Sequence, residues 1–108
     1  MTVNDAIKTA DQQKPNSIDE EIKKRWLCTL EGMIRRELSI GGTISPETIS
    51  DLCVAYPYDN LYPAYLVMRI DLENDELDNY NRDAGTFNRL WSSYASTVVQ
   101  RRMEGGSK

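Results

Sequence analysis

The sequence predicts an all-α protein, a small bundle of four to five helices in which a long C-terminal helix forms an antiparallel hairpin. Three observations indicate this fold class. Apolar residues alternate at spacings of three and four over the last third of the chain, a nearly uncharged apolar run precedes that segment, and helix-capping residues stand in the N-terminal half. The 108 residues fit one domain, because domains most often contain about 100–150 residues.

The first expected helix is short, is capped by Thr2 and extends to about Gln13. Its apolar residues recur at helical spacing on one face, at Val3, Ala6, Ile7 and Ala10. The sequence Lys14-Pro15-Asn16 then ends the helix. We expect residues 1–16 to form a peripheral part of the single domain and residues 104–108 to form a flexible tail.

A capping box, Ser17 followed by Glu20, predicts the start of a second helix, because each side chain can accept a hydrogen bond from the other residue's backbone N–H. Its predicted buried stripe consists of Ile22, Trp26, Leu30, Met33 and Leu38. The opposite face places an acid one turn before a base at Asp19/Lys23, Glu20/Lys24, Glu21/Arg25 and Glu31/Arg35. We therefore interpret the basic run 23–25 as part of a solvated face, and Gly41-Gly42 as the end of the helix.

The segment after these glycines fits two interpretations. Ser45 can act as a cap with Pro46 at the first helical position, which predicts a short helix from Pro46 to Val54. The β-branched residues of the same segment also suit extended chain, and they are Thr43, Ile44, Thr48 and Ile49.

The next helix is expected to begin at Pro63, after a turn through residues 58–62, and to end near Asn74. Apolar residues surround most of its circumference, which is typical of a helix enclosed by other helices. We therefore expect it to be the central helix of the bundle. A tight turn should follow, with Asn74 in the left-handed conformation and Asp75 as the next cap.

The last helix has the strongest periodicity. Its apolar seam comprises Leu77, Tyr80, Ala84, Phe87, Trp91, Tyr94 and Val98. A helix from about Glu76 to Met103 would be roughly 40 Å long, more than a domain of this size needs to cover its core. We expect part of it to project. Its far end, Trp91, Tyr94, Val98, Arg101 and Arg102, is the candidate protein interface.

Composition argues against several functions. With 17 acidic and 13 basic side chains the net charge is −4, which does not favour binding to nucleic acid. The absence of histidine removes the commonest general base and metal ligand, so we expect no enzyme and no cofactor. Asp71, Glu73 and Asp75 alternate as in a calcium loop, but Glu76 replaces the required glycine and Arg82 the terminal glutamate.

The two cysteines, Cys28 and Cys53, lie in apolar patterns, and we expect both to be reduced. The polar start of the chain and the lack of a long apolar run indicate a cytoplasmic setting and no membrane segment.

Several segments resemble the head–tail connector (adaptor) proteins of tailed bacteriophages and prophages of Gram-positive bacteria. The resemblance covers most of the chain between Lys14 and Tyr94. It is carried by Lys14-Pro15-Asn16, Asp19-Glu20, Trp26-Leu27, Leu30-Glu31, Ile34, Pro57 to Tyr62, Tyr65-Leu66, Ile70 to Leu72, Glu76, Tyr80-Asn81 and Phe87-Asn88. The chain departs from the family at Asp75, where a glycine is frequent, and at Asn60, where an acid is frequent.

The resemblance implies a small helical virion protein of the head–tail junction that is assembled in the cytoplasm of the bacterial host. Such a protein forms a homo-oligomeric ring beneath the portal, extends the DNA exit channel and docks head-completion or tail proteins. DNA would pass without specific binding, as the acidic balance also suggests.

The alternative is a small helical regulatory or partner-binding module, such as a transcription factor or an antitoxin-like protein. It would require a helix-turn-helix with a basic recognition helix. The candidate turn, Gly41 to Thr43, leads into ISPETISDLCV, which contains no basic residue.

Overall fold

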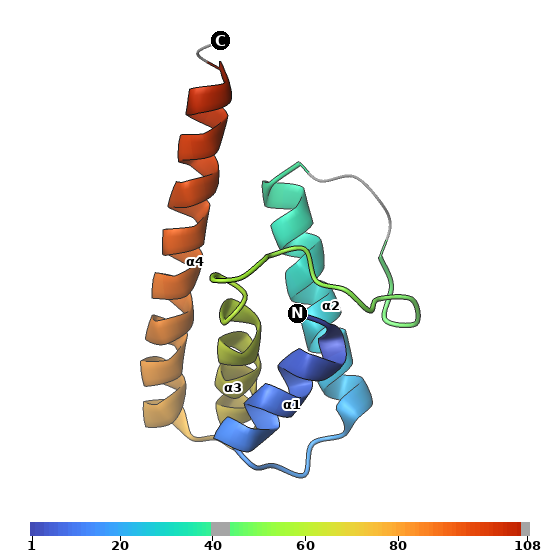
Figure 1. The fold of residues 1–108 in the computed structure, drawn as a ribbon. Helices are drawn as coiled ribbons and strands as arrows, with labels where there is room; N and C mark the ends of the chain where they lie inside the picture. Colours follow the sequence, from blue (N-terminus) through green and yellow to red (C-terminus); the bar gives the residue numbers. More distant parts are fainter. Residues whose placement is uncertain (40–43, 107–108) are drawn as a thin grey trace.

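The structure is a computed structural model that describes residues 1–39 and 44–106, with side chains described as far as Arg101. These residues form four helices, α1 (Val3–Gln13), α2 (Glu20–Glu37), α3 (Leu61–Glu73) and α4 (Leu77–Gly106), shown in Figure 1. Within the described ranges no strand forms, and one isolated bridge of β type joins Thr2 to Asp51. The predicted all-α class is confirmed, and α3 and α4 form the expected antiparallel hairpin.

Helix α1 is an integral part of the core and not the peripheral helix that we expected. Its buried side chains face α2 and α3, and they are Val3, Ala6, Ile7 and Ala10. Thr2 caps the helix as predicted, and its Oγ1 accepts a hydrogen bond from the Asp5 N–H at 3.1 Å. The N–H of Val3 also donates to the carbonyl of Ser50 at 2.8 Å. This pairing with the α2–α3 loop holds the start of α1 against the bundle.

The cap of α2 is Asp19, so the predicted cap at Ser17 was wrong. Oδ1 of Asp19 accepts a hydrogen bond from a backbone N–H of the first turn at 3.2 Å. The capping box at Ser17 does not form because Oδ1 of Asn16 accepts from the Ile18 N–H at 3.0 Å, which holds the chain in a turn ahead of the helix.

The buried face of α2 is rotated relative to the predicted stripe. Ile22 and Met33 are 45% and 59% exposed, whereas the buried positions are Lys23, Leu27, Leu30, Glu31 and Ile34. The stripe moved because two charged residues, Lys23 and Glu31, are buried with polar partners from other segments, which apolar periodicity does not indicate. Lys23 was therefore wrongly placed on a solvated face, while the predicted pair Glu31–Arg35 does form, at 3.6 Å. The helix ends at Glu37, and Gly41-Gly42 lie outside the described residues.

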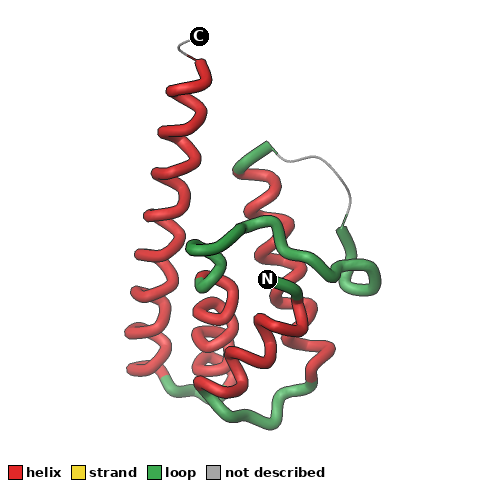
Figure 2. Tube along the Cα trace, in the orientation of Figure 1, coloured by secondary structure: helices red, strands yellow, loops and turns green. Residues whose placement is uncertain are grey.

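The short helix predicted from Pro46 to Val54 does not form. One turn links the carbonyl of Ser45 to the N–H groups of Thr48 and Ile49, and the chain then continues without helical structure. The apolar side chains of this segment reach the core, and the buried ones are Ile49, Leu52 and Val54. Figure 2 shows the long α2–α3 loop passing over the N-terminal end of α3 towards α4.

Helix α3 contacts each of the other three helices, which confirms it as the central helix. It begins at Leu61, two residues before the predicted start at Pro63. A proline is tolerated there because the first four N–H groups of a helix have no intrahelical acceptor. Asp75, with a φ of 56°, takes the left-handed conformation that we had assigned to Asn74.

Helix α4 is longer than any other element and extends beyond them. Its 30 residues would span roughly 45 Å at 1.5 Å per residue, and the molecule measures 50 × 31 × 19 Å. The C-terminal turns rise past the ends of α2 and α3 in Figure 1. The projection that the sequence predicted is therefore present. The helix continues to Gly106, so the expected flexible tail does not begin at residue 104, and residues 107–108 lie outside the described residues.

Candidate functional site

The middle of α4 packs inward through its aromatic side chains. Phe87 lies 5.3 Å from Tyr65 of α3, and Tyr94 lies 5.5 Å from Tyr58 of the α2–α3 loop, as ring-centroid distances. Trp91 lies 6.1 Å from Tyr94 and contacts the core as well. Trp91 and Tyr94, predicted as interface residues, are thus half-buried and stabilise the hairpin of their own chain.

The end of α4 has a different environment. The hydroxyl groups of Thr97 and Tyr58 are hydrogen-bonded at 3.0 Å. Past Thr97, the described side chains of the helix form no hydrogen bond or ion pair with the rest of the molecule. Val98 is half-buried, Val99 is 55% exposed and Arg101 is exposed, whereas the side chain of Arg102 lies outside the described residues. At this end the predicted interface therefore includes described side chains that do not bond to the bundle, and its binding of a partner stays a prediction.

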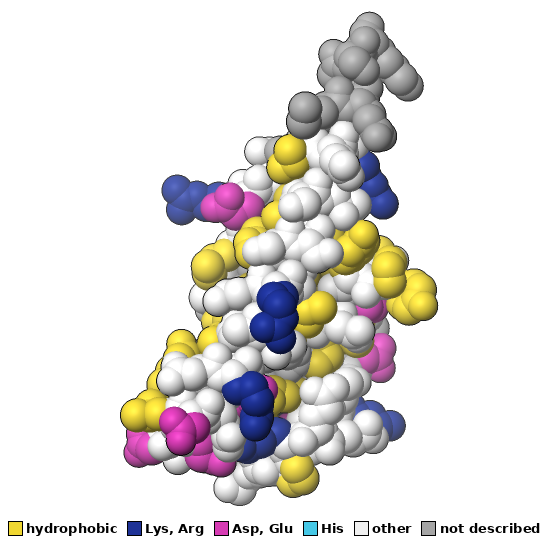
Figure 3. Space-filling model, turned by 90° about the vertical axis from the view of Figure 1, so that its left-hand side faces the viewer, with side chains coloured by type: hydrophobic (Ala, Val, Ile, Leu, Met, Phe, Trp, Pro, Cys, Tyr) yellow, Lys and Arg dark blue, Asp and Glu magenta, His cyan; other side chains and the backbone are white. Residues whose placement is uncertain are grey.

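The outer face of α4 is unusually poor in charge. Residues 84–101 contain no acidic side chain and two basic ones, Arg89 and Arg101, although the whole chain carries a net charge of −4. Serine, asparagine and glutamine occupy most of the remaining exposed positions. Figure 3, which faces this side, shows uncharged surface with isolated basic groups along its middle and acidic groups concentrated towards the lower end. A partner that packs on this face has few charges to desolvate.

An apolar groove runs between α2 and α4, with α3 as its floor. Its volume is about 380 Å³, and it is lined by Leu30, Met33, Ile34, Glu37, Tyr65, Phe87 and Trp91. Met33 stands at its edge and is largely exposed. Among the described lining residues, Glu37 carries the only charge. The sequence did not reveal this groove, because its lining comes from three helices whose mutual orientation depends on the tertiary fold.

A buried carboxylate anchors the loop that supports α4. Glu31 of α2 is fully buried, and its Oε2 accepts from the Cys53 N–H at 2.7 Å while its Oε1 accepts from the Tyr62 hydroxyl at 2.7 Å. The Tyr62 oxygen in turn accepts from the Val54 N–H at 3.0 Å. Burial and then the carboxylate of Glu31 raise the pKa of the Cys53 thiol to about 11. Burial also raises the pKa of Tyr62. The network ties α2, α3 and the loop between them together.

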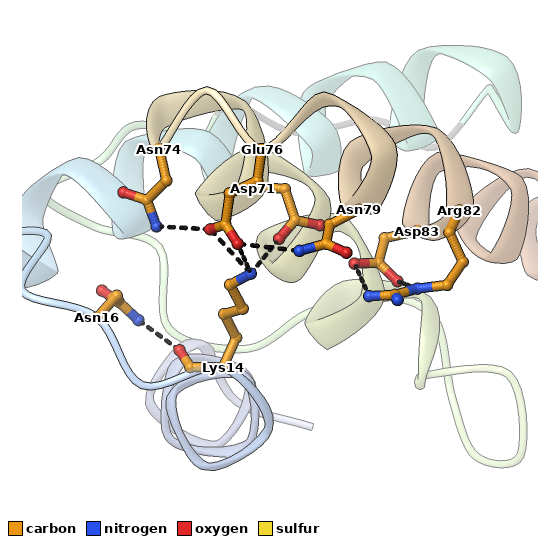
Figure 4. Close-up of polar contacts among 8 residues, drawn as sticks. All are labelled: Lys14, Asn16, Asp71, Asn74, Glu76, Asn79, Arg82 and Asp83. Atoms are coloured by element: carbon orange, nitrogen blue, oxygen red, sulfur yellow. Dashed lines mark hydrogen bonds and ion pairs between the residues drawn. The ribbon is translucent and has the colours of Figure 1, made fainter.

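A second polar cluster joins the α1–α2 connection to the hairpin turn, as drawn in Figure 4. Nζ of Lys14 lies 2.8 Å from Oδ1 of Asp71 and 3.0 Å from Oε2 of Glu76. Asp71 is fully buried, and Asp83 of α4 lies beside it. Arg82 pairs with Asp83 at 3.3 Å. The α1–α2 connection and the hairpin of α3 and α4, which are distant in sequence, therefore meet at one set of charges.

The protonation of this cluster follows from its contacts. Burial, and then the neighbouring carboxylate of Asp83, raise the pKa of Asp71. Burial opposes the ionisation of Asp83, but its hydrogen bonds with Asp71 and Arg82 outweigh that effect and lower its pKa. The hydrogen bond from Lys14 lowers the pKa of Glu76, and those to Asp71 and Glu76 raise the pKa of Lys14. The cluster clamps the hairpin turn to the α1–α2 connection.

Both cysteines are free thiols, and burial also raises the pKa of Cys28. No group of three or more cysteine, aspartate or glutamate side chains in the described ranges is placed to hold a metal ion. None of the helices, over the part of the chain that is described, is long and apolar enough to cross a membrane.

No family model matches the chain, and no curated protein or solved structure is detectably similar to it. Its function is therefore inferred from the geometry described above and from the resemblance carried by its residues.

Proposed function

We propose that this chain is a structural assembly protein that binds its partners through the C-terminal end of α4. The observation that carries the proposal is the projection of this end beyond the rest of the bundle, with Val99 and Arg101 exposed. Helical segments shorter than about 12–15 residues are marginal in water when nothing packs against them. A projecting helix end with valines on its surface is therefore best stabilised by a partner.

The particular assembly we propose is the head–tail connector of a tailed phage or prophage. In this role the subunits form a ring beneath the portal protein, extend the DNA exit channel and dock head-completion or tail proteins. The low charge of the outer face of α4 supports close packing between proteins. The acidic balance of the chain supports passage of DNA without specific binding. The protein would then reside in the virion, at the head–tail junction.

The alternative of a helix-turn-helix regulator has less support. The segment that would have to supply its recognition helix, residues 46–54, is not helical, and the candidate turn at Gly41 to Thr43 lies outside the described residues.

The test is electron microscopy of the protein mixed with the portal protein of the same phage or prophage. We expect rings of this chain on the portal, and Val99→Asp should abolish them without lowering the stability of the fold. Ile22→Asp is the matched control, because Ile22 is similarly exposed but lies on α2. Absence of binding by the unmodified chain, or rings that form equally well with Val99→Asp, would refute the proposal.

A further inference from the structure

We propose that the groove between α2 and α4 binds the C-terminal end of α4 from a second copy of the chain. The inference rests on the proposed function and specifies the surface that receives the projecting helix. It follows from three properties of the described residues: the composition of the groove, the composition of the helix end, and the distance between the two within one molecule.

The groove requires an apolar occupant with a positive charge. Its lining is formed by aliphatic and aromatic side chains, with Glu37 as the only charge among the described lining residues. Its volume of about 380 Å³ corresponds to roughly a dozen water molecules at ~30 Å³ each. Release of this water from an apolar surface favours association. Glu37 is exposed at the edge of the groove, where its carboxylate favours a cationic partner over an anionic one.

The end of α4 has the matching composition. Val98 and Val99 supply the apolar surface, and Arg101 is the only charged residue in the described turn that follows Thr97. Val98 and Arg101 are three residues apart, so both lie on one face of the helix. One insertion can therefore place Val98 in the groove and the guanidinium of Arg101 near Glu37, with Val99, the next residue, at the rim of the same contact.

The end of α4 cannot occupy the groove of its own chain. Phe87 and Trp91 of the same helix line the groove. Val98 follows Trp91 by seven residues, which places it roughly 10 Å further along a continuous helix. Because α4 is unbroken from Leu77 to Gly106, its end points away from the groove. The complementary surfaces therefore belong to different copies, and such head-to-tail contacts build rings when they close.

The experiment measures self-association by sedimentation velocity from micromolar to millimolar concentration. We expect the unmodified chain to associate, and Met33→Asp in the groove and Val99→Asp on the helix end each to weaken association at least about tenfold. Both residues are more than half exposed, so both variants should fold. Ile22→Asp, which lies on α2 outside the groove, should associate normally.

Charge reversal identifies the contact itself. Glu37→Arg and Arg101→Glu should each weaken association roughly fivefold, the size of one exposed ion pair, and the double variant should recover it. A chain that stays monomeric at millimolar concentration, or one that associates without sensitivity to Met33→Asp, overturns the inference. Neither result would refute the proposed function, which is tested separately by ring formation on the portal protein and by the loss of those rings in Val99→Asp.

Discussion

The hydroxyl group of Tyr62 on α3 donates a 2.7 Å hydrogen bond to Oε1 of Glu31, a fully buried carboxylate on α2. The same hydroxyl oxygen accepts from the N–H of Val54. One phenol thus connects two helices and the loop between them. This loop carries Tyr58, which packs on Tyr94 and is hydrogen-bonded to Thr97 of α4. Through Tyr58, the buried network therefore helps to position the turn of α4 that contains Thr97.

Replacing Tyr62 by phenylalanine tests this network. The change removes a donor from a buried carboxylate and the acceptor of a buried backbone N–H, so we expect a loss of roughly 2–3 kcal/mol of unfolding free energy. Urea unfolding followed by circular dichroism measures it. Tyr56→Phe is the control, because Tyr56 is 86% exposed and the same change there should have almost no effect. Equal stability of both variants would show that the network contributes nothing.

The buried lysine of α2 provides a second prediction. Lys23 is 3% exposed, and its Nζ donates to Oδ1 of Asp11 at 2.8 Å. Lys23→Ala removes both this link between α1 and α2 and the packing of the lysine stem, which we expect to cost roughly 1–3 kcal/mol. Thermal unfolding compared with Lys24→Ala, a more exposed neighbour, provides the measurement. A larger effect at Lys24 would contradict our description of this face.

The reactivity of Cys53 should be low. Burial and the Glu31 carboxylate raise the pKa of its thiol to about 11, so its thiolate fraction at about pH 8 is small. In a Cys28→Ser variant, we expect iodoacetamide to alkylate the folded protein at least about 100-fold more slowly than the protein unfolded in urea, whose thiol has an ordinary pKa of about 8.5. Mass spectrometry records the rates. Alkylation at the unfolded rate would mean that the thiol is accessible and ionises normally.

The stability that the clamp at the hairpin turn provides through the ion pair of Lys14 and Glu76 should depend on pH. The hydrogen bond from Lys14 lowers the pKa of Glu76 in the folded state. A lowered pKa stabilises the fold above the unfolded pKa of about 4.3, and this contribution disappears as the pH falls through the folded value. Glu76→Gln should therefore lower the unfolding temperature at about pH 7 and have almost no effect at about pH 2.5.

The matched control for this clamp is Glu73→Gln. Glu73 is exposed near the same turn and forms no ion pair among the described contacts. Its replacement should leave the unfolding temperature nearly unchanged at both pH values. A pH-independent effect of Glu76→Gln would assign the stabilisation to packing instead of the charge of the carboxylate.

The local features of the fold could be predicted from the sequence. The cap at Thr2, the apolar spacing of α1 and the seam from Tyr80 to Val98 specify helices, because capping and periodicity involve residues within one or two turns of each other. The length of α4, and hence its projection, follows from the same periodicity. Leu77 was predicted to belong to the apolar seam, but it lies at the hairpin turn and is largely exposed.

The candidate site was predicted only in part. Val98 and Arg101 were named from the sequence, and binding of a partner there stays a prediction, whereas Trp91 and Tyr94 pack on their own chain. Periodicity identifies an apolar edge of a helix but does not say which neighbour covers it. That depends on the loop carrying Tyr58, whose path was not predicted.

The sequence by itself determined that the chain is helical, that α3 and α4 form a hairpin and that α4 is longer than the bundle. The tertiary structure decided which face of α2 is buried, the irregular course of residues 44–60 and the existence of the groove. These features depend on contacts between distant residues, such as Lys23 with Asp11 and Glu31 with Tyr62. A charged residue can replace an apolar one in a core only when its partner is in place, and that partner is defined by the fold.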